Sequence, residues 1–110
     1  MKTFELWTWQ PAGWQQPHPC VIVSHPDRAE RKNPVEVCMC STQRANRPPE
    51  GAEILLDSAD GLDWPTLCKC DVIHAVDRAD LKQRRGLVSE ARRANLVRTI
   101  ISAHRWADVL

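Results

Sequence analysis

The sequence lacks the features of membrane, secreted and strongly charged proteins. No apolar run approaches the roughly 18 residues that cross a bilayer. Segment 1–5 has neither the apolar stretch nor the small-residue cleavage site of a secretory signal. The 15 Lys and Arg residues almost balance the 14 Asp and Glu residues, so a globally basic nucleic-acid binder is not indicated. We therefore expect a cytoplasmic protein that contacts no membrane.

Tyrosine is absent and phenylalanine occurs once, so five tryptophans supply nearly all the aromatic surface. Exposed indole rings can stack on unpaired bases, as in many proteins that bind single-stranded RNA. Trp14 is the best candidate for this role, because segment 10–19 holds three prolines and a glycine that predict a loop. Trp7, Trp64 and Trp106 are expected to be core or dimer contacts.

The 110 residues, 43% of them hydrophobic and 26% charged, fit one compact domain over 1–110 and argue against wholesale disorder. Positive charge is concentrated in residues 78–105, where eight Lys or Arg residues face only two acids. Such a basic surface would attract phosphate-bearing ligands. A solvated helix face is the simpler alternative.

Short apolar segments predict a mainly β protein. Alternation over residues 4–9 predicts a strand with Phe4 and Leu6 on one face and Trp7 and Trp9 on the other. Further strands are predicted at 20–24, 35–41 and 52–56. Residues 66–72 and 73–76 are predicted to form one strand or two. A short helical turn is predicted within 26–33, a loop at 46–51 and a turn at 57–61.

A C-terminal helix is predicted from Glu90 to about Trp106, with the Ser89 hydroxyl accepting a hydrogen bond from an early backbone N–H. The predicted apolar stripe of this helix consists of Ala94, Val97, Ile100, Ile101 and His104. Short strands with irregular loops, followed by a helix, predict a small β-barrel with helices packed outside it.

The triplet Lys69-Cys70-Asp71 is the first candidate for chemistry. In a strand, alternation places Lys69 and Asp71 on one face, with Cys68 and Cys70 on the other. A carboxylate beside an ammonium group can divide a base role and a charge-stabilising role in phosphoryl chemistry. An idle surface ion pair is the alternative.

Polar groups near two other predicted strands extend this candidate site. Ser41 and Thr42 end a strand, where hydroxyls can donate to a phosphate oxygen or hydrogen-bond to their own turn. His18 is held between Pro17 and Pro19 in the predicted loop, and its imidazole can act as an acid or a base near neutral pH. A purely structural loop histidine is the alternative.

The five cysteines form one isolated residue and two C-x-C pairs: Cys20, Cys38, Cys40, Cys68 and Cys70. Structural zinc sites typically separate paired cysteines by roughly two to four residues, so the C-x-C spacing favours core thiols over a four-thiolate zinc site. An odd count also argues against a disulfide framework. No metal or other cofactor is therefore expected.

The order of these segments resembles the PemK/MazF family of type II toxin–antitoxin toxins over about residues 4–106. Four stretches carry the resemblance, which is strongest from Asp57 to Asp77: residues 18–24, 40–42, 54–57 and 67–77. The resemblance implies an SH3-like β-barrel with peripheral helices and a C-terminal α-helix. It also implies a homodimer and an antitoxin chain that lies across the dimer groove.

The implied activity is metal-independent cleavage of single-stranded RNA, in which the ribose 2′-hydroxyl attacks the adjacent phosphorus. The family's Arg-Cys-Asp triplet corresponds to Lys69-Cys70-Asp71, which implies Asp71 as the base and Lys69 as the proton donor and charge stabiliser. Ser41 and Thr42 correspond to the family's Thr-Ser pair and would bind the phosphate. His18 stands where the family has an arginine before proline, and is the alternative proton donor.

The family's Gly-x-Glu-Gln loop is replaced here by residues 13–16, of which Trp14 and Gln16 are expected to bind the substrate. The usual N-terminal Arg-Gly-Asp/Glu start is replaced by residues 6–9. Because His18 and Lys69 both replace arginine, a second hypothesis is a barrel that has lost catalysis and binds a peptide or RNA. A third hypothesis is a small domain stabilised by zinc.

Overall fold

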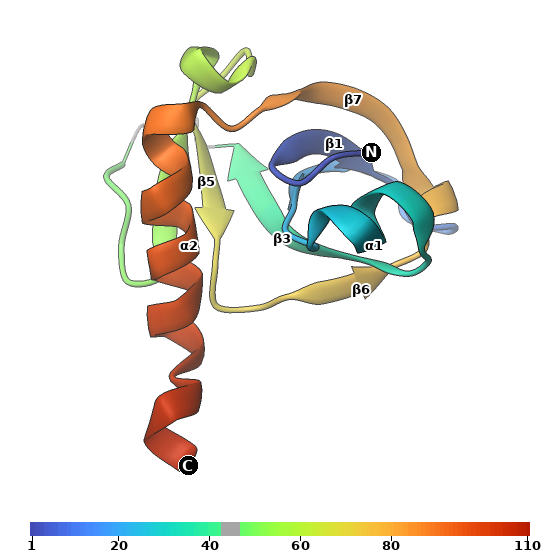
Figure 1. Cartoon of the computed structure of the whole chain (residues 1–110). Coiled ribbons are helices and arrows are strands. Elements are labelled where there is room, and N and C mark those ends of the chain that lie inside the picture. Colours follow the sequence, from blue (N-terminus) through green and yellow to red (C-terminus); the bar gives the residue numbers. More distant parts are fainter. Residues whose placement is uncertain (43–46) are drawn as a thin grey trace.

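A curved antiparallel sheet of seven strands forms the centre of the computed structural model, which describes residues 1–42 and 47–110 (Figure 1). The strands follow the order β4-β5-β3-β2-β1-β7, with β6 beside β3. Their bounds are β1 Glu5–Trp9, β2 His18–Ile22, β3 Val35–Thr42, β4 Glu53–Leu56, β5 Thr66–Lys69, β6 His74–Val76 and β7 Leu81–Leu87. The predicted mainly β fold is confirmed.

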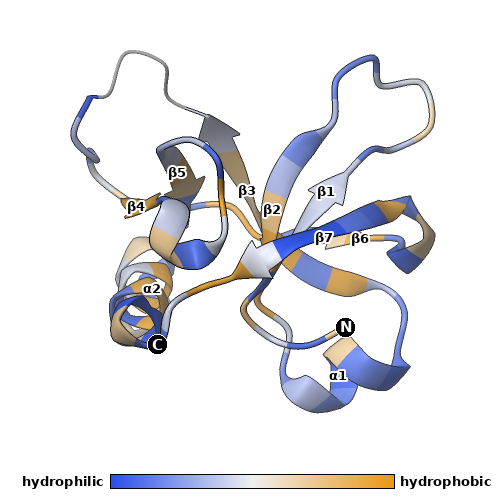
Figure 2. Ribbon diagram, turned by 90° about the horizontal axis from the view of Figure 1, so that it is seen from above, coloured by the Kyte–Doolittle hydropathy of each residue, from blue (hydrophilic) through white to orange (hydrophobic). Residues whose placement is uncertain are grey.

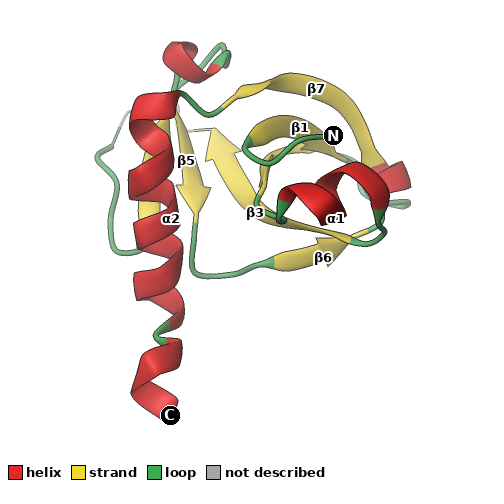
Figure 3. Cartoon of the chain, in the orientation of Figure 1, coloured by secondary structure: helices red, strands yellow, loops and turns green. Residues whose placement is uncertain are grey.

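Two α-helices accompany the sheet, α1 (Pro26–Arg31) and α2 (Glu90–His104) (Figure 3). Short 3-10 turns, labelled η1 to η3, occupy Ser58–Asp60, Arg78–Asp80 and Trp106–Val109. No helix in the described part of the chain has the length and apolar character needed to cross a membrane.

Strand β3 connects the two halves of the sheet, because it pairs with β2, β5 and β6. On one face, Cys38 and Cys40 join the apolar cluster that contains Leu96 of α2. On the other face, Val35 and Val37 join the cluster that contains Ala29 of α1. Both faces of this strand are therefore buried over its central part. Figure 2 shows the two helices on separate sides of the sheet.

The two predicted faces of the first strand are confirmed. Leu6 and Phe4 pack in the cluster beneath α2, whereas Trp7 and Trp9 pack in the cluster beneath α1. Phe4 itself precedes the strand, in a left-handed conformation with φ of 71°.

The predicted loop 10–19 is wrong at its end, because β2 begins at His18. Pro19 has no backbone N–H to donate. It is tolerated in this strand because the pairing of β2 with β3 starts only at Cys20, so β3 needs no hydrogen bond from residue 19. Strand β7 was not predicted, because most of its residues are charged or polar and give no apolar alternation. The predicted loop 46–51 begins at Asn46, which lies outside the described residues.

The C-terminal helix is confirmed, but its predicted apolar stripe is right only at Ile100 and His104, which are half-buried, and wrong at Ala94, Val97 and Ile101, which are exposed. Leu96, which the stripe omitted, is fully buried and Ile100 is half-buried, whereas Val97 and Ile101 are 41% and 55% exposed. The predicted cap is also wrong. The Ser89 hydroxyl makes no capping bond, and the backbone N–H of Ser89 donates to the Asp60 carboxylate at 2.7 Å.

A buried carboxylate joins the turn after β4 to the start of α2. Asp60 is fully buried and also accepts hydrogen bonds from the Asp57 N–H at 2.9 Å and from Arg92 at 2.5 Å. Arg92 binds the Asp57 carboxylate through two further hydrogen bonds, of 2.8 and 3.0 Å. Gly86 of β7 passes so close that a Cβ there would collide with the Asp60 carbonyl oxygen. This arrangement fixes β4, β7 and α2 relative to one another.

The Arg92 guanidinium lowers the pKa of Asp57, so we predict an acid-sensitive contribution to stability. A carboxyl with a lower pKa in the folded than in the unfolded chain stabilises the fold above about pH 4, and this contribution is lost as the pH falls through the folded pKa. Asp57→Asn should therefore unfold more easily at pH 7 and lose less further stability in acid. Urea unfolding between pH 7 and pH 2 measures both effects. Asp27→Asn on the exposed side of α1 is the control, and parallel pH curves for the two variants would contradict the assignment.

Candidate functional site

Lys69 and Asp71 line the same cavity, of about 340 Å³. Lys69 ends β5, and Asp71 lies in the turn that follows. The Cys70 N–H holds this turn by donating to the Ala52 carbonyl oxygen at 2.9 Å. The predicted strand through Asp71 was therefore too long. The predicted alternation still holds, because Cys68 and Cys70 are fully buried while Lys69 and Asp71 are exposed.

An ion pair between Arg47 and Glu53 forms part of the wall of this cavity. Arg47 binds both carboxylate oxygens of Glu53, each at 2.8 Å, and Glu53 is the cross-strand partner of Lys69. The hydrogen bonds from Arg47 hold the pKa of Glu53 below its usual value, and the nearby Lys69 charge adds to this effect. Sequence reasoning missed Arg47 and Glu53, because their place beside Lys69 depends on the register of β4 against β5.

Ser41 and Thr42 lie at the end of β3, opposite Leu67 and Thr66 of β5. Alternation along β5 puts Lys69 on the same face as Leu67, so Ser41 shares a face of the sheet with Lys69 while Thr42 points to the other face. Thr66 and Lys69 are at opposite ends of β5, about 10 Å apart at the usual rise of a strand. The hydroxyls of Ser41 and Thr42 therefore lie farther along the sheet and do not line the cavity of Lys69 and Asp71.

His18 belongs to an aromatic cluster at the β1–β2 hairpin. Its ring meets the Trp14 ring edge-on, with centroids 5.5 Å apart, and Trp14 lies 5.3 Å from Trp9. The ring of His74 also lies near Trp9, with centroids 5.4 Å apart. Trp14 remains 44% exposed, and Gln16 is exposed in the same loop. The structure thus groups His18 with Trp14.

His18 does not share the cavity of Lys69 and Asp71. Strand β3 separates β2 from β5, and two strand spacings amount to about 10 Å. Continuing the β2–β3 register by two residues from the Cys20–Met39 pair brings His18 level with Ser41. The candidate residues therefore form three neighbouring groups on one sheet.

Two tryptophans are more exposed than the sequence predicted. Trp64 and Trp106 expose 66% and 57% of their surfaces, so the prediction of core positions is wrong for both. Their alternative assignment as dimer contacts stays a prediction. Trp7 is half-buried and packs against the cluster beneath α1.

All five cysteines are buried free thiols. Cys40 and Cys68 are direct cross-strand partners. Hydrogen bonding of Cys68 with the thiols of Cys38, Cys40 and Cys70 raises the pKa of Cys68, and burial raises the pKa of Cys20. Within residues 1–42 and 47–110, no group of three or more His, Cys, Asp or Glu side chains is arranged to hold a metal ion. The C-x-C pairs contribute small apolar side chains to the core.

The sequence matches the family model described as PemK-like, MazF-like toxin of type II toxin-antitoxin system, over residues 5–104. The chain belongs to this family. The match includes the cavity of Lys69 and Asp71, the end of β3 and the aromatic cluster. None of the curated proteins compared with the sequence matches it significantly.

Solved structures of MazF-type proteins share the fold. The Mycobacterium tuberculosis toxin MazF-mt6 is 19% identical, with a TM-score of 0.77 over 92% of this chain and 96% of that chain. An endoribonuclease in complex with its cognate antitoxin from Mycobacterial species is 16% identical, with a TM-score of 0.81 over 96% of both chains. At these identities the likeness establishes the same arrangement of strands and helices for this PemK/MazF chain.

Because all five thiols are buried, the native protein should resist thiol reagents. The raised pKa values of Cys20 and Cys68 add to this resistance, whereas hydrogen bonding with Cys68 lowers the pKa of Cys70, so that burial alone protects the Cys70 thiol. We expect a disulfide reagent such as Ellman's to modify almost none of the five cysteines in the folded chain, and all five in guanidinium chloride. Added chelator should leave the native result unchanged. Thiols that become reactive when EDTA is added would instead identify a metal site.

Proposed function

We propose that this PemK/MazF family member is an endoribonuclease that cleaves single-stranded RNA without a metal ion, as the toxin of a type II toxin–antitoxin pair. The observation that carries the proposal is the cavity that Lys69 and Asp71 share, in a chain matched to this toxin family over residues 5–104. A carboxylate and an ammonium group in one cavity supply the base and the acid that phosphodiester cleavage by a 2′-hydroxyl needs.

In this mechanism the Asp71 carboxylate takes the proton of the ribose 2′-hydroxyl as its oxygen attacks the neighbouring phosphorus. The bond from phosphorus to the 5′-oxygen breaks, which leaves a 2′,3′-cyclic phosphate. Lys69 gives a proton to the departing 5′-oxygen. We assign this proton to Lys69 because Lys69 lines the Asp71 cavity, whereas His18 lies two strands away.

The phosphate gains negative charge as the 2′-oxygen attacks, and the Lys69 ammonium stabilises it. Arg47 is already bound to Glu53, so it neutralises that carboxylate beside the phosphate. Ser41 emerges on the same face as Lys69 and would hydrogen-bond to a phosphate of the same RNA strand. Thr42 points to the other face of the sheet, so the phosphate contact predicted for the hydroxyl pair is assigned to Ser41 alone.

We assign base binding to the exposed ring of Trp14. Contacts with Trp9 and His18 hold this ring in place, so stacking a base on it costs little ordering entropy. Stacking of this kind stabilises binding by about 1–3 kcal/mol per base. Gln16 follows in the same loop and offers an amide that donates and accepts hydrogen bonds.

Asp71→Asn should lower the rate of RNA cleavage by about a hundred- to ten-thousand-fold, because the base is lost while the shape is kept. Asp63→Asn is the matched control, since Asp63 is an exposed aspartate outside the cavity. Gel analysis with end-group mapping should find 2′,3′-cyclic phosphate and 5′-hydroxyl ends, with or without EDTA. Equal cleavage by both variants would contradict the mechanism, and RNA binding by the unsubstituted chain without cleavage would favour a binding module.

We also propose two protein partners, an antitoxin and a second copy of this chain. One of the structures that share the fold is an endoribonuclease in complex with its cognate antitoxin, which supports the first partner. The exposed apolar side chains of Val97, Ile101 and Trp106 support the second. Val97 and Ile101 are one turn apart on α2, and Trp106 follows in η3, so the C-terminal part of the chain exposes large apolar side chains, as expected of a surface that a second copy covers.

Ile101→Asp should convert the dimer to a monomer, because a charge in an apolar interface has no partner there. Sedimentation velocity measures the change in mass. Gln83→Asp introduces the same charge at an exposed position of β7 and should leave the dimer intact. A monomeric unsubstituted chain at micromolar concentration would refute the dimer.

A further inference from the structure

The imidazole of His104 joins the end of α2 to the turn that carries Asp71. His104 is the last residue of α2 and is half-buried. Its Nε2 atom lies 3.1 Å from the backbone carbonyl oxygen of Cys70, 34 residues earlier in the chain. A carbonyl oxygen only accepts hydrogen bonds, so Nε2 is the donor and carries a proton. The sequence predicted His104 as part of an apolar stripe, whereas the structure gives its ring this polar partner.

The carbonyl group that His104 binds belongs to the peptide between Cys70 and Asp71. A peptide unit is planar, so a hydrogen bond that fixes the Cys70 carbonyl also fixes the direction in which the chain enters Asp71. Pairing of β5 with β4 ends at Lys69, two residues before Asp71. The sheet therefore stops short of the carboxylate, and the bond from His104 acts on the peptide next to it.

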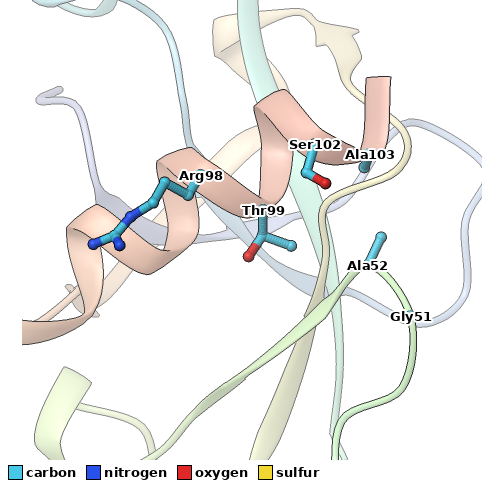
Figure 4. Close-up of a pocket in the computed structure, with 6 residues that line it drawn as sticks. All are labelled: Gly51, Ala52, Arg98, Thr99, Ser102 and Ala103. Carbon is cyan, nitrogen blue, oxygen red and sulfur yellow. The ribbon is translucent and has the colours of Figure 1, made fainter. Parts of the chain in front are cut away.

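Cys70 is held from two directions. Its N–H donates to the Ala52 carbonyl oxygen at 2.9 Å, and its own carbonyl oxygen accepts from His104. Ala52 and Ala103, the residue before His104, both line a cavity of about 370 Å³ between the segment before β4 and α2 (Figure 4). The backbone of Cys70 therefore bridges these two elements directly before Asp71.

The C-terminal turn holds the His104 ring in place. Arg105 ends α2 in a left-handed conformation, with φ of 51°. Trp106 then stacks on His104, with ring centroids 5.1 Å apart and planes 18° apart. Arg105 also donates to the Asp108 carboxylate at 2.7 Å. Helix ends commonly fray, and these contacts keep His104 ordered at the last position of its helix.

Other contacts attach α2 to the rest of the fold. Arg92 binds Asp60 near the start of the helix, and Leu96 is fully buried in its middle. These contacts hold the helix without His104. Loss of the His104 bond should therefore act on the turn that carries Asp71 more than on the position of α2.

We propose that His104 is a positioning residue for the Asp71 carboxylate. Its Nε2–H holds the Cys70 carbonyl oxygen and so directs Asp71 toward the cavity that Asp71 shares with Lys69. His104 contacts neither the substrate nor the reacting atoms, and it acts through Asp71. The inference rests on the proposed function, because it takes Asp71 to be the base that activates the 2′-hydroxyl.

Two substitutions of similar shape test the role of the donor. His104→Met removes it, whereas His104→Gln keeps an N–H at a similar reach. His104→Met should lower kcat for cleavage of a short single-stranded RNA by about ten- to a hundredfold with KM nearly unchanged, because the base loses its orientation while the substrate contacts remain. His104→Gln should restore most of the lost rate.

Thr99→Val is the matched control on α2. It removes another side-chain hydrogen bond, from the Thr99 hydroxyl to the Asn95 carbonyl oxygen at 2.7 Å, and should leave kcat unchanged. An equal loss for Thr99→Val, or a loss that His104→Gln does not restore, would overturn the inference and give His104 a purely structural role. A raised KM at constant kcat would overturn it by making His104 a substrate contact. Dissociation of the dimer in His104→Met alone, seen by sedimentation velocity, would overturn it by assigning the effect to a subunit contact.

A double-substitution cycle separates the inference from the proposed function. In the Asp71→Asn chain, His104→Met should cause no further loss of rate, because the base that His104 positions is already absent. If the further loss equals the loss seen with Asp71 present, the inference fails and the nuclease proposal stands. If Asp71→Asn cleaves as fast as the unsubstituted chain, the proposed mechanism fails and the inference fails with it.

Discussion

The pairing of β3 with three other strands is the constraint on which the rest of the structure depends. Its residues alternate between two apolar clusters, so neither face of its central part can carry a polar group without a partner. Glu36 has such partners, since it binds the Ser24 hydroxyl and lies 3.4 Å from Arg28. The part of β3 that is buried on both faces ends before Ser41 and Thr42, and the proposed RNA-binding face begins there.

Much of the positive charge near the C-terminus stabilises the fold. The sequence predicted a basic surface over residues 78–105, but several of these arginines are already bound within the protein. Arg78 donates to three backbone carbonyls at the end of α1, Arg84 pairs with Glu5, and Arg92 joins the turn after β4 to α2. The cation that shares a cavity with Asp71, Lys69, comes instead from the end of β5, outside this segment. Placement in the fold, more than total charge, therefore decides which cations can bind a phosphate.

Local patterns were enough to predict which side chains share a face. The opposite faces of Leu6 and Trp7, and of Cys70 and Asp71, follow from alternation along the chain, and the structure confirms both. Register between distant strands has no such local signal. For that reason the sequence did not reveal Arg47 and Glu53 beside Lys69, nor the distance of His18 from Asp71.

The errors in α2 and β7 have similar physical origins. Apolar residues on α2 follow two rows of helical spacing, and only contact with the sheet selects the row of Leu96 and Ile100 over that of Val97 and Ile101. In β7 the apolar ends, Leu81 and Leu87, enclose a charged middle that pairs with β1 through backbone hydrogen bonds. Backbone hydrogen bonds do not depend on side-chain hydropathy, so the hydropathy pattern of this segment did not predict the strand.

A crystal structure of the chain with a single-stranded oligonucleotide that carries a 2′-deoxy sugar at the cleaved position tests the central claim most directly. The account predicts a phosphate within hydrogen-bonding distance of Lys69 Nζ, with the C2′ atom of the preceding sugar facing the Asp71 carboxylate. An oligonucleotide bound with all its phosphates outside the cavity of Lys69 and Asp71 would contradict it.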